Sequence, residues 1–236
     1  MQKIIRMRIL LIYFSFMVAI SSSVNAQNSG ASIFEPKLTG KLFIYDSNII
    51  GEQYFSKQWC KGDLKLNNGL IIRDEYLKYN CYLSKFIHLN DSNIQVELDD
   101  ALIDEVTFFV EKGNKTVFRK IWYKSLNQKD SIRAFAQVLS EDKNLLIVHR
   151  LVVNDKNENV TTSSGTYSKT RVMQKPLYIF KLRDGRDVVI SSLRTKSVIN
   201  SFANNSINVK ELMKKNRLKI RNEYDLVRLN YILDNY

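Results

Sequence analysis

Alternating apolar and polar side chains dominate the middle of this chain. Leu77, Tyr79 and Cys81 share one parity, whereas Lys78 and Asn80 share the other. A period of two is typical of a half-buried antiparallel strand, with one face toward a core and one toward water. Further strands are expected at 41–45, 64–67, 94–98, 106–110, 116–123, 134–139, 145–153, 177–181 and 188–190. Many short strands without long helices between them predict an antiparallel sandwich or partly open barrel.

Two other patterns interrupt or follow the strands. Residues 154–175 are mostly Asn, Lys, Thr and Ser, and are interpreted as a long mobile loop. After residue 195 the spacing becomes helical, with Asn208 and Asn222 as helix caps and a further short helix over 197–202. An apolar stripe on the last helix, formed by Leu226, Leu229 and Leu233, needs a surface to pack on, and the sheet is the simplest one.

The fold class is therefore α+β and mainly β, with two or three short C-terminal helices packed on the sheet. The expected division of the chain is a signal peptide at 1–26, an irregular lead-in at 27–56, an antiparallel β domain at 57–194, and a helical segment at 195–236 that packs on the same domain.

The first 26 residues have the pattern of an export signal. Lys3, Arg6 and Arg8 precede an apolar run over 9–20, and small residues lead to Ala26. The run is shorter than the roughly 20 apolar residues of a membrane span, which favours a cleaved peptide over an anchor. We expect cleavage after Ala26, no transmembrane span in the mature chain, and a location in the periplasm, at the outer-membrane periphery or outside the cell.

An oxidising compartment permits a disulfide between the two cysteines, Cys60 and Cys81. A two-residue turn at Asn68-Gly69 would place Asn67 opposite Leu70 and pair Cys60 with Leu77. Cys81 would then lie about 13 Å further along its strand, too far for a bridge unless the strand bends near residues 74–75. Both the bridged and the free states remain open from the sequence.

The chain is basic, with 36 Lys and Arg, 24 Asp and Glu, and a formal net charge of +12. Such a charge suits anionic lipids, acidic glycans or nucleic acid, but it does not identify a site. Most basic residues are dispersed, with one dense run over 214–221. We expect no nucleic-acid partner.

No sequence motif for catalysis, cofactor binding or metal binding is found, so no residue is assigned to these roles. His88 and His149 are the only histidines, and each lies in an apolar strand. Two acidic stretches suggest calcium ligands, but solvated turns explain the first and the second lacks the glycine and the bidentate glutamate of a calcium loop. The first stretch comprises Asp99, Asp100, Asp104 and Glu105, and the second Asp155, Asn157 and Asn159.

Aromatic residues are frequent in the N-terminal strands. Most are expected to fill the core, because aromatic side chains favour strands and bury large areas. Tyr76 and Tyr82 fall on the polar parity. They are the candidate surface-binding residues.

A set of positions resembles a class of uncharacterised exported Bacteroidetes proteins that are rich in β-strands and have C-terminal helices. The similar positions are Gly51, Tyr54, Trp59, Gly62, Leu64, Leu66 and Gly69, then residues 77–80, and the closing segment from Lys214 through Glu223 to Tyr231. The two cysteines and the stretch over 154–175 depart from that pattern. The resemblance implies an envelope or secreted protein, and it implies no activity and no catalytic residue.

Two functional hypotheses follow. The first is a non-enzymatic envelope module that binds or supports a protein, lipid or glycan partner, without a cofactor. The second is a hydrolase that acts on envelope glycan or lipid through an unfamiliar site. A deep pocket that gathers His88 or His149 with two carboxylates would favour the hydrolase.

Overall fold

The computed structural model describes residues 38–110, 113–124, 131–203 and 207–236. The predicted signal peptide, its cleavage site after Ala26, and the first part of the lead-in lie outside the described residues. The rest of the lead-in contributes two short strands, β1 (Gly40–Leu42) and β2 (Ile49–Gly51).

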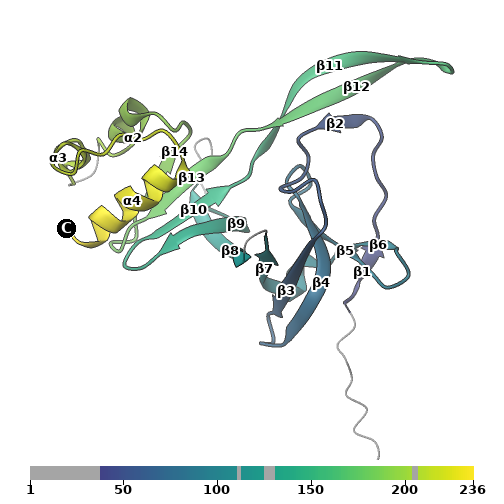
Figure 1. Ribbon diagram of the computed structural model, residues 1–236, viewed down its shortest axis with the longest axis horizontal. Coiled ribbons are helices and arrows are strands. Elements are labelled where there is room, and N and C mark those ends of the chain that lie inside the picture. The colour runs from purple at the N-terminus through teal and green to yellow at the C-terminus, as the bar shows by residue number, and fades with distance from the viewer. Residues whose placement is uncertain (1–37, 111–112, 125–130, 204–206) are drawn as a thin grey trace, which may run out of the picture. The chain divides into compact units, whose positions relative to one another are not determined.

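One antiparallel sheet of eleven strands forms most of the protein (Figure 1). Its strands are ordered β1-β6-β5-β4-β3-β7-β8-β9-β10-β13-β14. Their bounds are β1 Gly40–Leu42, β3 Cys60–Leu66, β4 Ile71–Asn80, β5 Lys85–Leu89, β6 Gln95–Leu98, β7 Ile103–Phe109, β8 Lys115–Lys124, β9 Ser131–Glu141, β10 Leu145–His149, β13 Leu177–Lys181 and β14 Asp187–Ile190. The mainly β, antiparallel fold class is confirmed, and in the described residues the sheet does not close into a barrel.

A second sheet corrects the sequence interpretation of residues 154–175. Instead of a loop, the chain forms a long hairpin of β11 (Val152–Thr162) and β12 (Gly165–Gln174). A short strand, β2 (Ile49–Gly51), pairs with β12 in parallel. Nearly all side chains of the hairpin are exposed or half-buried. It therefore lacks the apolar alternation that marks a strand with one buried face.

The predicted strand over 145–153 is likewise divided. Its first part is β10, between β9 and β13 in the large sheet, and its last two residues begin β11 in the small sheet. The chain thus passes from one sheet to the other at Arg150 and Leu151, within a stretch that is nearly all apolar.

Aromatic side chains fill the core of the N-terminal strands. Phe86 lies at ring-centroid distances of 4.8 Å from both Tyr79 and Phe135, and Tyr79 lies 4.7 Å from Phe118. All four are buried. Because they belong to β4, β5, β8 and β9, these contacts hold together strands that are not neighbours in the sheet.

Three helices pack on the C-terminal strands, as the sequence predicted. They are α2 (Thr195–Ser201), α3 (Val209–Lys215) and α4 (Glu223–Asp234). The side chains of Asn208 and Asn222 accept hydrogen bonds from backbone N–H groups in the first turns of α3 and α4, which confirms both caps. Leu226, Leu229 and Leu233 are buried in a core shared with β10, β13 and β14.

The same strands bury side chains on their other face. On β10, Leu146 and Val148 belong to the core beneath the helices, whereas Ile147 packs with Ile179 in a separate cluster. The backbone N–H of Lys124 on β8 donates a 3.0 Å hydrogen bond to the Asp187 carboxylate at the start of β14. This part of the sheet therefore curls, bringing β14 toward β8. None of the helices in the described residues has the length and apolar character needed to cross a membrane.

Candidate ligand-binding surface

A row of alternating aromatic and lysine side chains crosses four neighbouring strands. Tyr76 on β4 lies directly opposite Lys61 on β3, Lys61 lies opposite Phe109 on β7, and Phe109 lies opposite Lys115 on β8. Residues that face each other across a sheet project to the same side. With strands about 4.8 Å apart, the three intervals make a row about 14 Å long.

The ammonium groups of this row lie over neighbouring rings. Lys61 Nζ is 5.7 Å from the ring centroid of Tyr76, and Lys115 Nζ is 5.6 Å from that of Phe109. Beside the row, Lys78 Nζ lies 5.3 Å from the ring centroid of Tyr54 and 4.9 Å from that of Trp59. Such distances are those of cation–π contacts. We call the seven residues Tyr54, Trp59, Lys61, Tyr76, Lys78, Phe109 and Lys115 the aromatic–lysine surface.

Carboxylates of the described residues do not neutralise the lysines of this surface. In the described part of the chain, none of Lys61, Lys78 and Lys115 forms an ion pair. Burial lowers the pKa of Lys78, because desolvation disfavours its charged form. An anion bound beside Lys78 would restore the interactions that this cation has lost with water.

A groove opens along the surface. Its cavity volume is about 690 Å³, and its apolar wall includes Trp59, Tyr76 and Phe109. Gln58 and Asn114 also line it, and their side chains can donate and accept hydrogen bonds. The groove therefore combines flat apolar rings, an ammonium group from Lys61 and neutral polar groups.

The local sequence explains how this surface is built. Gly62 and Leu64 are the buried positions of β3. Lys61, one position before Gly62, therefore lies on the opposite, exposed face of the strand. A Cβ at Gly62 would lie 2.6 Å from the carbonyl oxygen of Thr107, so glycine allows β3 to approach β7 closely. This close pairing brings Lys61 beside Phe109.

The two tyrosines predicted as surface residues have different surroundings. Tyr76 is 47% exposed and belongs to the row, whereas Tyr82 is 37% exposed and lies in the turn after β4. Sequence reasoning missed Lys61, Phe109 and Lys115. The predicted pairing of Cys60 with Leu77 already implied that Lys61 faces Tyr76, but no local signal pairs β3 with β7.

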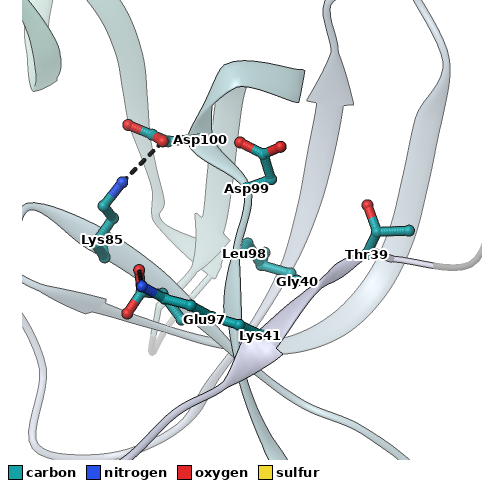
Figure 2. Close-up of a pocket in the computed structure, with 8 residues that line it drawn as sticks. All are labelled: Thr39, Gly40, Lys41, Lys85, Glu97, Leu98, Asp99 and Asp100. Carbon is teal, nitrogen blue, oxygen red and sulfur yellow. Dashed lines mark hydrogen bonds and ion pairs between the residues drawn. The ribbon is translucent and has the colours of Figure 1, made fainter.

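A second pocket, with a volume of about 420 Å³, is lined mainly by charged and polar groups (Figure 2). Lys85 pairs with Asp100 at 2.8 Å, and Lys41 pairs with Glu97 at 3.3 Å. Asp99 accepts a hydrogen bond from the backbone N–H of Ala101 and caps a 3₁₀ turn at Asp100–Leu102. These charges already have partners within the chain, which makes this pocket the weaker candidate.

The suggested calcium ligands hold local structure instead. Asp100 is paired in the second pocket, and Glu105 accepts a 2.8 Å bond from Arg119. Asn157 accepts a hydrogen bond from Thr170 across the hairpin. In the residues that the structure describes, no group of three or more His, Cys, Asp or Glu side chains could hold a metal ion.

Both histidines are engaged by side chains nearby. His149 Nδ1 lies 2.5 Å from the hydroxyl oxygen of Tyr123, and His88 Nε2 lies 2.6 Å from a carboxylate oxygen of Glu75. His149 is buried, and burial lowers its pKa. Neither His88 nor His149 belongs to the aromatic–lysine surface.

The cysteines are free thiols in the structure. Cys60 pairs with Leu77 across β3 and β4, as predicted, and Cys81 follows the end of β4. Burial raises the pKa of Cys81 to about 12.

The fold and the surface define the chain as an antiparallel β-sheet protein with C-terminal helices and an exposed aromatic–lysine surface. No protein-family model, curated protein or solved structure was found to match it.

Proposed function

We propose that this protein is an exported, non-enzymatic module of the cell envelope, and that it binds an acidic glycan on the aromatic–lysine surface. The observation that carries this proposal is the cross-strand row of Tyr76, Lys61, Phe109 and Lys115, whose ammonium groups form no ion pair with the described residues. The export signal predicted from the first 26 residues supports the compartment.

A sugar chain with carboxylate groups fits the chemistry of this row. The apolar faces of sugar rings can stack on Tyr76 and Trp59, as amphipathic rings prefer at partly wet surfaces. Carboxylates can pair with the ammonium groups of Lys61 and Lys115, which lie on either side of Phe109. Hydroxyl groups can bond to the polar side chains along the groove.

The shape of the surface favours a glycan over a lipid. A lipid tail requires a deep apolar cavity, whereas this groove is open and lined partly by Ser56, Gln58 and Asn114. Cleavage after Ala26 removes three basic residues, so the mature chain keeps 33 basic and 24 acidic residues and a formal net charge of +9. This charge attracts a polyanion from a distance, and the row then supplies contacts at close range.

Calorimetric titration of the purified protein with polygalacturonate, with neutral dextran as the comparison, tests the proposal. We expect binding to polygalacturonate, weakened by salt, and little binding to dextran. Trp59→Ala and Lys61→Gln should each weaken binding at least about fivefold, the effect of losing roughly 1 kcal/mol.

The control is Trp122→Ala, because Trp122 is 59% exposed and lies outside this surface. It should bind as the unchanged protein does. Equal binding of dextran and polygalacturonate, or equal losses in Trp59→Ala and Trp122→Ala, would contradict the proposal.

A further inference from the structure

The β11–β12 hairpin presents a long strand edge without a partner. In the described residues, β11 pairs only with β12, and β2 covers only Thr170–Val172 on the other side of β12. Figure 1 shows the two strands as an extended ribbon. An edge strand with unpaired N–H and C=O groups is a template for another strand.

The ribbon has little core of its own. Residues 161–168 are all exposed, and toward the base only Val172 is buried. A two-stranded ribbon without a packed face is marginally stable in water, and additional strands stabilise it. The edge of β11 thus offers backbone hydrogen bonds that would stabilise the hairpin.

The hydrogen bonds of β12 show which groups of β11 point outward. The backbone N–H of Thr170 donates to the carbonyl oxygen of Asn48, and the carbonyl oxygen of Val172 accepts from the backbone N–H of Glu52. The backbone hydrogen-bonding groups of Thr170 and Val172 therefore point away from β11. Thr170 lies opposite Asn157. In an antiparallel ladder, the residue opposite an outward-facing residue also faces outward, so Asn157, Asn159 and Thr161 direct their N–H and C=O groups to the free edge.

We propose that a second copy of this chain pairs along this edge, with the two β11 strands antiparallel about a twofold axis at Asn157. Asn157 then lies opposite Asn157 of the second copy, in a pair that exchanges backbone hydrogen bonds. Two hairpins that pair through their β11 strands form one continuous sheet across the dimer. The contact is isologous, because both copies use the same strand.

Charge complementarity selects this register. Within one chain, Lys156 Nζ already lies 2.9 Å from a carboxylate oxygen of Glu158, which also pairs with Arg171 at 2.7 Å. With the axis at Asn157, Lys156 also lies opposite Glu158 of the second copy, and Glu158 opposite its Lys156, so the four charges alternate in sign around the axis. Opposite charges that face each other on adjacent strands are favourable, whereas like charges are not. Moving the axis by one residue would place either Lys156 or Glu158 opposite itself. In this register residues 159–162 lie opposite residues 155–152 of the second copy, so the bulge of β11 between Asn154 and Lys156 lies at both ends of the contact. The pairing that is regular in both copies is therefore centred on Lys156–Glu158.

Sedimentation velocity over a wide range of protein concentrations tests this proposal, which is independent of the proposed glycan binding. We expect a monomer–dimer equilibrium in the unchanged protein. Lys156→Glu and Glu158→Lys should each raise the dimer dissociation constant about tenfold or more, since each places like charges face to face. An equimolar mixture of the two variants should form a mixed dimer, because opposite charges then face each other again.

A second variant separates edge pairing from damage to the hairpin. Asn159→Pro removes an N–H that points to the free edge and not to β12, and it leaves the hydrogen bond from Thr170 to the Asn157 side chain in place. It should also weaken dimer formation. Lys210→Glu, an exposed residue on α3, is the matched charge control and should leave the dimer unchanged. A monomer at all concentrations, or a dimer insensitive to the three β11 variants, would overturn the proposal.

Discussion

Tyr123 on β8 and His149 on β10 are joined by a hydrogen bond of 2.5 Å that passes over the strand between them. That strand, β9, contributes Ala134 and Ala136 to the same cluster. Because alanine side chains are small, they leave room for the tyrosine ring to reach the imidazole. The pair is buried, and burial lowers the pKa of His149.

This pair should make stability depend on pH. Unfolded His149 takes up a proton below about pH 6.5, whereas the buried folded form stays neutral to lower pH. The unfolded state therefore binds more protons in that interval, and the free energy of unfolding falls as the pH falls from about 6.5. In His149→Gln, which cannot titrate, the decline measured by urea unfolding between about pH 6.5 and 5 should be shallower. An unchanged slope would refute this expectation.

The register of β3 and β4 shows how a sequence prediction can be correct for a reason that is partly wrong. Cys60 pairs with Leu77 as predicted. However, Leu66 rather than Asn67 lies opposite Leu70, so the turn has three residues, with Gly69 at φ 85°. A bulge further along, where Asp74 has φ 59°, adds one residue to β4 and restores the predicted pairing.

The hairpin over residues 152–174 was missed for a different reason. Its strands have no apolar face, and polar cross-strand contacts such as the ion pair of Glu158 with Arg171 at 2.7 Å hold them together. Pattern analysis detects burial, and these strands bury little. The pairing of Lys61 with Phe109 was likewise unpredictable, because it depends on where β7 enters the sheet and not on local sequence.

The N-terminal cap of α4 should contribute measurably to stability. The Asn222 side chain accepts a 3.0 Å hydrogen bond from the backbone N–H of Asp225. Asn222→Ala removes this acceptor and should lower the free energy of unfolding by about 1 kcal/mol. Asn222→Asp keeps an acceptor and should lose much less. Denaturant titration of both variants distinguishes them, and equal losses would show that the cap is not responsible.

The aromatic core should be far more sensitive than the exposed aromatic positions. Phe86 is 1% exposed and contacts rings from β4, β8 and β9. Phe86→Ala should cost about 3–5 kcal/mol, through lost burial and the cavity that remains. Trp122→Ala, at a position 59% exposed, should change stability by less than about 0.5 kcal/mol. Similar losses in the two variants would contradict the described core.

The two thiols should differ sharply in reactivity. Cys60 is half-buried and lines the groove, whereas Cys81 is 3% exposed and burial raises its pKa to about 12. Since the thiolate is the reactive form, iodoacetamide should modify Cys60 in the folded protein and Cys81 only after unfolding. Mass spectrometry under non-reducing conditions should accordingly find one modification before denaturation and a second one after it. In Cys60→Ser, the native modification should disappear. A chain that accepts no label even when unfolded would instead indicate a Cys60–Cys81 disulfide, which would require β4 to bend away from its pairing with β3.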